Sequence, residues 1–548
     1  MELDNLSIPR KVQHWANKHP DDEALVFVSK DGPRTALTCA DVFNKSKVFG
    51  LHLLQLGVSP GSVVVNLLDD SPEAFLVFFG TQFAGCKSMK LIIGPGDDEF
   101  LIHLLNTTNC QTIVISSDPE NATTKILSKL IHRMSGNKVN STAIPSLKFV
   151  VDSKDIDVNQ VGFICQEEVS DSRSVNIEDT MDNGGVLMVS SGTTGPSKII
   201  ELSRQGLQES MHKIFKCVMD QYPNSNMFNM RKLFWFLGIP QWYLCTGNRS
   251  VHIDNRFPIQ EDDLPKFVFD TIINESCECA KLDPMTCSKF NYFLQSDHKL
   301  RNKWPLKVVW TGGKPLTQSI KEVIGTVCHT FHNMYGSSEM NLLTMKKIEK
   351  DTEFEDFNSG SFFYDIKMKI IDENLKEVTN GASGHLTFQR SPYFFVGYVG
   401  NEELTKQSFS EDGYFFSKDY GRVKPNGELI IQGRTEDIVS RDGNIYHASQ
   451  IESLVRKAPG VYQVTVINVT VNQKEDLCAC IVPRVGVSVS EQDVRDFCEN
   501  EFGKDPQLKE GCPGYYLTLK KFPTNINGKV VRRTLRSNAE RSINLHLY

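Results

Sequence analysis

The segment from Gly184 to Lys198 has the sequence GGVLMVSSGTTGPSK, and the prediction of the fold starts from it. It opens with an apolar run, Val186 to Val189, typical of a buried strand. A loop of serine, threonine and glycine follows, and then Lys198. Glycine lets successive backbone N–H groups turn inward, and the hydroxyls add donors, so the loop suits the terminal phosphates of ATP. The spacing is not that of a Walker A loop, and this segment alone could also be a Ser/Thr-rich surface turn.

Strands and helices alternate on either side of this stretch. The first predicted elements are a helix at 40–56, a strand at 62–68, a helix at 73–84 and a strand after Gly85. The alternation recurs near 184–215 and 305–345. It predicts an α/β fold with a mostly parallel sheet and helices on both faces. Residues 115–180 are polar and are expected to form irregular excursions.

The pattern changes in the last third of the chain. Short strands separated by glycine and asparagine begin at residue 384 and indicate a β-rich subdomain. After Gly433 a fresh α+β pattern starts, with strands near 463–469 and 477–482 and helices at 449–457 and 490–502. We therefore predict a large multi-subdomain α/β domain at 1–432 and a small α+β domain at 433–548.

Composition and the chain ends restrict the class of protein. The net charge is −7 and the isoelectric point is about 6.0, which argues against nucleic acid as a main partner. The amino end lacks a signal peptide, no apolar run reaches the length of a membrane span, and the carboxyl end LHLY is not Ser-Lys-Leu. We therefore expect a cytoplasmic protein with no transmembrane segment. The oligomeric state stays open.

The 14 cysteines do not have metal-ligand spacing. Cys478 and Cys480 share one face of an expected strand, where thiols pack as small hydrophobic groups. We expect core thiols rather than ligands.

Further motifs follow the Ser/Thr/Gly loop in chain order. They are TGG at 311–313, YGSSE at 335–339, the segment 384–398, Asp419, GR at 433–434 with Asp437, and the segment 523–536 that contains Lys529. This ordered set resembles the adenylate-forming superfamily, which includes acyl- and aryl-CoA synthetases, adenylation domains of nonribosomal peptide synthetases and beetle luciferases. The resemblance covers nearly the whole chain, from the GVSPG turn at 57–61 to Leu535.

The resemblance implies a role for each matched residue. The β- and γ-phosphates of ATP would be held by Ser190, Ser191, Gly192, Thr193, Thr194, Gly195 and Lys198. The rest of the nucleotide site would be Gly312 and Gly313 as a backbone wall, Tyr335 stacked on adenine with Gly336 beside it, Asp419 on the ribose hydroxyls and Arg434 assisting. The catalytic residues would be Lys529, bridging the α-phosphate and the attacking carboxylate, Ser338, touching the α-phosphate, and Glu339, holding Mg²⁺. Glu436 matches a hinge near 434–438 on which a mobile small domain turns.

These residue types suit the implied reaction. Attack of a carboxylate on an α-phosphate brings two anions together, so catalysis must rest on charge neutralisation and positioning. An ammonium on a long stem can meet both anions, and Mg²⁺ offsets the charge of the pyrophosphate. The resulting mixed anhydride is ready for a second nucleophile such as a thiol.

Some of these residues have ordinary structural interpretations. Lys529 by itself could belong to a basic surface stretch, and Glu339 could be a solvated loop acid. Because Lys529 and Glu339 occur together with the other motifs, a functional role is favoured for both residues. The pair Arg532 and Arg533 is expected to be a solvated face, and His329 and His332 look like ordinary strand or loop residues.

The sequence departs from the family pattern where acyl groups and acceptors bind. Pro196 and Ile199 alter the phosphate loop, and Lys418 replaces the glycine before Asp419. The Pro-Phe-His-His segment is replaced by 234–240, so a histidine of the acyl pocket is missing. The ATP-handling residues are retained. Adenylation is therefore a firmer expectation than any particular acid or acceptor.

Three functions remain open at this point. The first is a ligase that forms an acyl-adenylate from ATP and a small carboxylic acid, and then a thioester with CoA. The second is a luciferase-type oxidoreductase acting on a luciferin-like substrate with O₂. The third is a non-catalytic relative that binds nucleotide.

Overall fold

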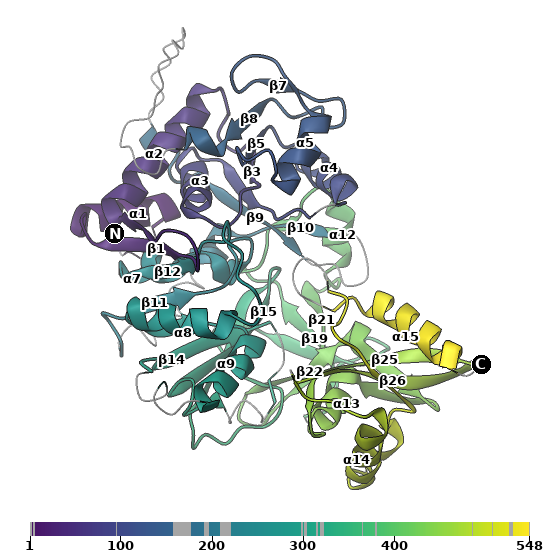
Figure 1. The fold of residues 1–548 in the computed structure, drawn as a ribbon. Helices are drawn as coiled ribbons and strands as arrows, with labels where there is room; N and C mark the ends of the chain where they lie inside the picture. Colours follow the sequence, from purple (N-terminus) through teal and green to yellow (C-terminus); the bar gives the residue numbers. More distant parts are fainter. Residues whose placement is uncertain are drawn as a thin grey trace.

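The computed structural model describes residues 3–546, apart from 4–5, 95, 157–176, 191–196, 209–220, 297–299, 301–303, 314–315, 318–322, 364, 379–380, 485, 507 and 525–529. Two large sheets and their helices make up the body of the molecule, and a smaller sheet with its own helices lies beside them (Figure 1). The α/β class predicted from the alternation is confirmed.

A seven-stranded sheet holds the amino-terminal alternating units. Its strands in spatial order are β20 (Gly397–Tyr398), β10 (Lys198–Glu201), β9 (Gly185–Ser190), β4 (Lys87–Lys90), β3 (Val63–Asn66), β5 (Thr112–Ile115) and β8 (Phe149–Asp152). The five from β9 to β8 run parallel, while β10 and β20 are antiparallel. The mostly parallel sheet that we expected is therefore present, and β9, the strand that precedes the Ser/Thr/Gly loop, lies inside it between β10 and β4.

A thirteen-stranded sheet contains the middle of the chain. In spatial order its strands are β18 (Met368–Ile371), β19 (Gly384–Gln389), β21 (Tyr414–Val423), β22 (Leu429–Arg434), β17 (Asn358–Phe362), β16 (Asn341–Ile348), β15 (Thr330–Ser337), β14 (Val308–Gly312), β13 (Cys277–Lys281), β11 (Asn226–Asn229), β12 (Ser250–Ile253), β1 (Glu23–Val28) and β2 (Thr35–Thr38). In this order the strands from β15 to β1 run parallel. The strands from β16 to β18 at one end of the sheet, and β2 at the other end, are antiparallel to their neighbours. The β-rich segment expected from residue 384 thus continues this sheet.

Alternation of buried side chains explains the layers. On β3, Val64 packs in the core shared by both large sheets, while Val63 and Val65 pack in a second core on the opposite face. The period of two that gives a strand two faces places helices on both sides of the sheet. The helices in the shared core are α1 (Ile8–Lys18), α2 (Cys39–Gln55), α3 (Pro72–Phe83) and α7 (Gln241–Thr246). On the outer face of the seven-stranded sheet lie α4 (Asp98–Thr107) and α5 (Ala122–Leu130). On the outer face of the thirteen-stranded sheet lie α8 (Leu264–Asn274) and α9 (Pro284–Ser296).

The expectation of irregular excursions at 115–180 is wrong for part of that stretch. Helix α5 and strand β8 lie in it, together with the hairpin of β6 (His132–Arg133) and β7 (Val139–Asn140). The polar residues that suggested a loop are turn and cap residues: Asn121 accepts the backbone N–H groups of Thr123 and Thr124 at 3.0 and 3.2 Å. A capping side chain is polar by function, so composition alone concealed the helix.

The carboxyl-terminal segment builds a separate small sheet. Its elements are β23 (Ile438–Arg441), β24 (Asn444–His447), α13 (Ala448–Val455), β25 (Val461–Val471), β26 (Lys474–Pro483), α14 (Glu491–Gly503), β27 (Tyr515–Thr518) and α15 (Arg532–His546). On β26, Leu477 and Ala479 face one core and Cys478 and Cys480 face another, so these two cysteines are core thiols as expected. Two cores of its own support, as a proposal, a small domain beginning at 433.

Arg532 corrects one prediction. Its guanidinium pairs with Asp437 at 2.8 Å and with Glu452 at 2.9 Å, whereas Arg533 is exposed. The expected solvated face therefore holds for Arg533 alone. The sequence placed both carboxylates far from Arg532, so only the packing of α15 against β25 brought them together.

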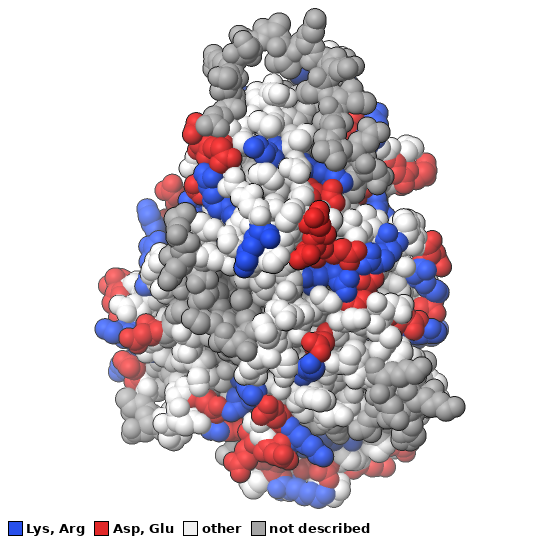
Figure 2. All heavy atoms as spheres, turned by 90° about the vertical axis from the view of Figure 1, so that its left-hand side faces the viewer, with Lys and Arg blue, Asp and Glu red and all other residues white. Residues whose placement is uncertain are grey.

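The surface carries both signs of charge. On the face drawn in Figure 2, lysine and arginine side chains alternate with aspartate and glutamate rather than forming a broad region of one sign. Among the described residues, no helix combines the length and the apolar character that crossing a bilayer requires.

Candidate nucleotide and acyl-adenylate site

The predicted nucleotide residues lie at the carboxyl ends of neighbouring strands. β14 ends at Gly312, and β15, its parallel neighbour, pairs Met334 with that glycine. Tyr335 follows immediately. Ligands in α/β sheets commonly bind beyond the carboxyl ends of parallel strands, and the loop at 191–196 also follows the carboxyl end of such a strand, β9.

Tyr335, Asp419 and Arg434 form one cluster. The Tyr335 hydroxyl donates to Asp419 Oδ2 at 2.5 Å, and Arg434 Nε lies 3.0 Å from Asp419 Oδ1. Asp419 and Arg434 are directly opposite each other on the antiparallel strands β21 and β22. Asp419 raises the pKa of the Arg434 guanidinium, and burial together with Asp419 raises the pKa of the Tyr335 phenol. The structure thus joins three residues that the sequence assigned to adenine and ribose.

Glu339, Tyr398 and Lys198 form a second cluster. The Tyr398 hydroxyl donates to Glu339 Oε1 at 3.0 Å, and Lys198 Nζ lies over the Tyr398 ring, 4.7 Å from its centroid. Burial lowers the pKa of the Lys198 ammonium, and the nearby cation of Lys418 lowers it further. A phosphate bound beside Lys198 would favour its charged form and raise that pKa again. Tyr398 was not assigned a role from the sequence, although it ends the motif at 384–398.

Ser338 and Gly336 complete the segment between these clusters. Ser338 is half-buried in the turn after β15. Gly336 sits at a bulge between β15 and β16, where a Cβ would lie 1.9 Å from the carbonyl oxygen of Asn341. Only glycine fits there because the obstructing atom belongs to the backbone.

We expect Gly336→Ala to lower the free energy of unfolding by about 2 kcal/mol, because the partner strand must move to admit the methyl group. Gly503→Ala is the matched control, since a Cβ on Gly503 meets nothing within 4 Å. Urea denaturation of both variants measures the effect. Equal stability of the two variants would contradict the packing argument.

The aromatic stretch at 234–240 lies against the TGG turn. A Cβ placed on Gly313 would lie 3.9 Å from Trp235 Cζ3. Arg231 Nη2 donates to the carbonyl oxygen of Gly312 at 3.1 Å, and the guanidinium carbon of Arg231 lies 5.6 Å from the centroid of the Trp235 ring. The segment that replaces Pro-Phe-His-His thus reaches the predicted nucleotide wall. No sequence motif identified Arg231.

Several predicted residues lie outside the described part of the chain. They are Ser191, Gly192, Thr193, Thr194, Gly195 and Lys529. Among their described neighbours, Ser190 pairs with Lys198 across β9 and β10, and Thr524 pairs with Val530 as an antiparallel bridge.

Lys418 has a left-handed backbone conformation. Its φ is 61°, in the left-handed region that glycine adopts without strain. The side chain is exposed, and Asp419, the next residue, is only 5% exposed. The bulky cation that the sequence placed beside the acid therefore does not displace that acid from the cluster.

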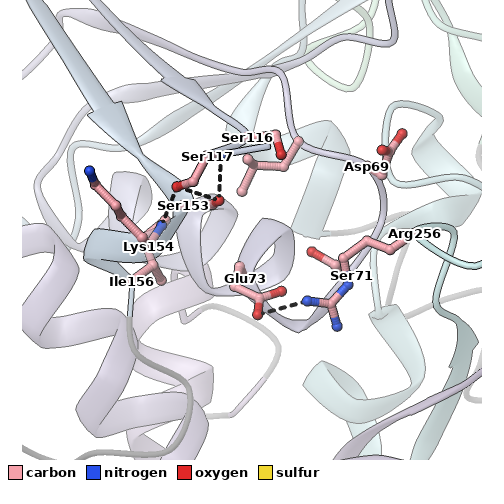
Figure 3. A pocket seen from close by; sticks show the side chains of 10 residues that line it. Asp69, Ser71, Glu73, Ser116, Ser117, Ser153, Lys154, Ile156 and Arg256 are labelled. Carbon is pink, nitrogen blue, oxygen red and sulfur yellow. Dashed lines mark hydrogen bonds and ion pairs between the residues drawn. The ribbon is translucent and has the colours of Figure 1, made fainter. Parts of the chain in front are cut away.

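A cavity of about 350 Å³ lies elsewhere, beyond the carboxyl ends of β3, β5 and β8 (Figure 3). Its polar side chains largely pair with one another: Glu73 with Arg256 at 3.0 Å, and the Ser153 hydroxyl with that of Ser117 at 3.1 Å. None of the predicted catalytic or nucleotide residues lines it. It is therefore distinct from the candidate site.

The family model described as AMP-binding enzyme matches residues 12–399. This chain belongs to that family. YngI of Bacillus subtilis, an acyl-CoA synthetase by name, is 22% identical over 99% of both chains. Two solved structures share the fold: the anthranilate CoA ligase AuaEII with anthranoyl-AMP (TM-score 0.78, 17% identity, 99% of this chain and 100% of that chain), and the O-succinylbenzoate CoA synthetase MenE of B. subtilis with ATP and magnesium ion (TM-score 0.73, 16% identity, 96% and 98%).

The family match confirms the resemblance deduced from the ordered motifs. In this AMP-binding enzyme the predicted residues Tyr335, Asp419 and Arg434 are joined by direct contacts, and Gly312 lies opposite Met334, the residue before Tyr335. Among the described residues, no three His, Cys, Asp or Glu side chains group as a metal site. A lone carboxylate such as Glu339 fits Mg²⁺, which commonly takes one or two carboxylates together with phosphate oxygens.

Proposed function

We propose that this AMP-binding enzyme activates a carboxylic acid as its acyl-adenylate with ATP and Mg²⁺, and then transfers the acyl group to CoA. The observation that supports it most is the cluster of Tyr335, Asp419 and Arg434, because a buried carboxylate held by a cation suits vicinal ribose hydroxyls. The names of the full-length relative and of the solved CoA ligases favour CoA as the acceptor.

In this proposal each residue binds a different part of ATP or its metal ion. Asp419 accepts hydrogen bonds from the ribose, and Tyr335 presents its ring to adenine. Lys198, with the loop at 191–195, binds the terminal phosphates. Glu339 would hold Mg²⁺, and the ion would supply positive charge near the pyrophosphate. Four of these residues belong to the two clusters described above, namely Asp419, Tyr335, Lys198 and Glu339.

The reaction then has two displacements. A substrate carboxylate oxygen bonds to the α-phosphorus, the bond to the pyrophosphate oxygen breaks, and Lys529 neutralises both anions as they approach. In the second step a thiolate sulfur bonds to the acyl carbon, and AMP leaves with the electron pair of the carbon–oxygen bond. A hinge near 434–438 would let the small domain serve both steps.

A pyrophosphate-release assay with fatty, aromatic and amino acids tests the proposal. We expect release with at least one acid, and thioester formation once CoA is added. Nucleotide binding without release for any acid would favour the non-catalytic alternative. Light emission with a luciferin and oxygen would favour the oxidative one.

A further inference from the structure

Arg231 is a partly buried cation without a carboxylate partner among the described residues. Its Nη2 donates to the Gly312 carbonyl oxygen at 3.1 Å, while its Nε is buried and lacks a hydrogen-bond partner. A guanidinium has five N–H donors, so most of its capacity is unused. Burying a charge without a partner is costly, which makes an incoming anion favourable there.

The neighbouring carboxylate is already engaged. Asp283 is close enough to Arg231 to influence its charge, but its oxygens accept the Thr286 backbone N–H at 2.9 Å and the Thr286 hydroxyl at 2.7 Å. These bonds fix the first turn of α9. Asp283 therefore helps the helix begin and does not form an ion pair with Arg231.

A second basic side chain lies in this region. Lys281, which ends β13, is 1% exposed and donates to the Leu237 carbonyl oxygen at 3.1 Å and to Gln241 Oε1 at 2.8 Å. Burial lowers the pKa of its ammonium to about 7, and the charge of Arg231 contributes to that shift. Both cations lie along the aromatic stretch that contacts the TGG turn.

We infer that the acid activated by this enzyme carries a second carboxylate, which Arg231 binds. This inference rests on the proposed function, because it assumes that the acyl group lies beside Gly312 and Gly313. The reacting carboxylate is served by Lys529, so Arg231 is free for a group at the other end of the acid. The Trp235 ring beside the guanidinium covers the chain between the two carboxylates.

Matched acids test this inference in the full-length enzyme. Pyrophosphate release is measured with succinate against butyrate, glutarate against pentanoate, and adipate against hexanoate, at saturating ATP and Mg²⁺. We expect kcat/KM for one dicarboxylate to exceed that for its monocarboxylate by about tenfold or more, because an acid lacking the second carboxylate leaves Arg231 unpaired. A preference for the monocarboxylates would overturn the inference.

Variants assign the preference to Arg231. Arg231→Met should remove the advantage of the dicarboxylate, mainly through KM, and should lower kcat/KM for the dicarboxylate more than for the matched monocarboxylate, because the reacting end is untouched. Arg231→Lys should restore part of the preference, and Arg231→Gln keeps a donor for Gly312 should the Met variant fail to fold. Arg133→Met, on the exposed hairpin of β6 and β7, is the control for loss of one arginine.

The remaining outcomes are separable. An equal loss for both acids in Arg231→Met and Arg231→Gln would assign Arg231 to the reacting carboxylate or to the turn, and would overturn the second carboxylate. Turnover of monocarboxylates alone would refute the inference while leaving adenylation standing. If ATP binds but no acid gives pyrophosphate release, adenylation itself would be overturned.

Discussion

Lys529→Ala should reduce acyl-adenylate formation by at least about 10²-fold while ATP binding survives, because a positioned charge that acts on the reacting groups is lost. The ammonium is proposed to meet the α-phosphate and the attacking carboxylate only as they approach each other. The proposed contacts of the nucleotide with Asp419 and Lys198 would remain. Pyrophosphate release and calorimetric titration with ATP measure the two effects separately.

The described residues on either side of Lys529 pair with each other. Thr524 bridges to Val530, and the Val531 N–H donates to the Pro523 carbonyl oxygen at 2.9 Å. Arg532 then pairs with Asp437, the residue after the proposed hinge residue Glu436. A turn of the hinge would therefore carry the lysine segment with it.

The control for Lys529 is Lys504→Ala. Lys504 is exposed at the end of α14 and pairs with Glu501 at 2.5 Å. Loss of this surface pair should leave both adenylation and ATP binding unchanged, since such pairs contribute about 0–1 kcal/mol. An adenylation rate in Lys529→Ala equal to that of the control would refute the role of the lysine.

Asp419→Ala should weaken ATP binding by on the order of 10²-fold, through the loss of charge-assisted hydrogen bonds to the ribose. The substitution also leaves the Tyr335 hydroxyl and the Arg434 guanidinium without their shared acceptor. We therefore expect a lower melting temperature as well. Calorimetric titration with ATP and Mg²⁺ measures the affinity, and thermal denaturation shows whether the variant is folded.

Asp412→Ala is the control for Asp419. Asp412 lies just before β21, is 57% exposed and pairs with Lys369 at 2.6 Å. Its loss removes the same charge from the same region without touching the cluster. ATP affinity within twofold of the wild type in a folded Asp419→Ala variant would show that the ribose binds elsewhere.

The sequence alone determined the family, the α/β class and most elements of the first sheet. These features follow from local patterns: apolar runs of four to six residues, helical periodicity, and motifs whose order can be read along the chain. The helix expected at 40–56 appears as α2, and the strand expected at 62–68 as β3. Local patterns failed at 115–180, where polar cap and turn residues hid α5 and β8.

The contacts between residues far apart in the chain depend on the tertiary structure. Glu339 and Tyr398 are 59 residues apart in the chain, Arg231 and Gly312 are 81 apart, and Tyr335 and Asp419 are 84 apart. The local sequence around a polar side chain does not identify its partner, because the contact depends on strand register and on the order of strands in a sheet. For that reason the sequence could list Asp419 and Arg434 as separate motifs, whereas the pairing of β21 with β22 made them one ion pair.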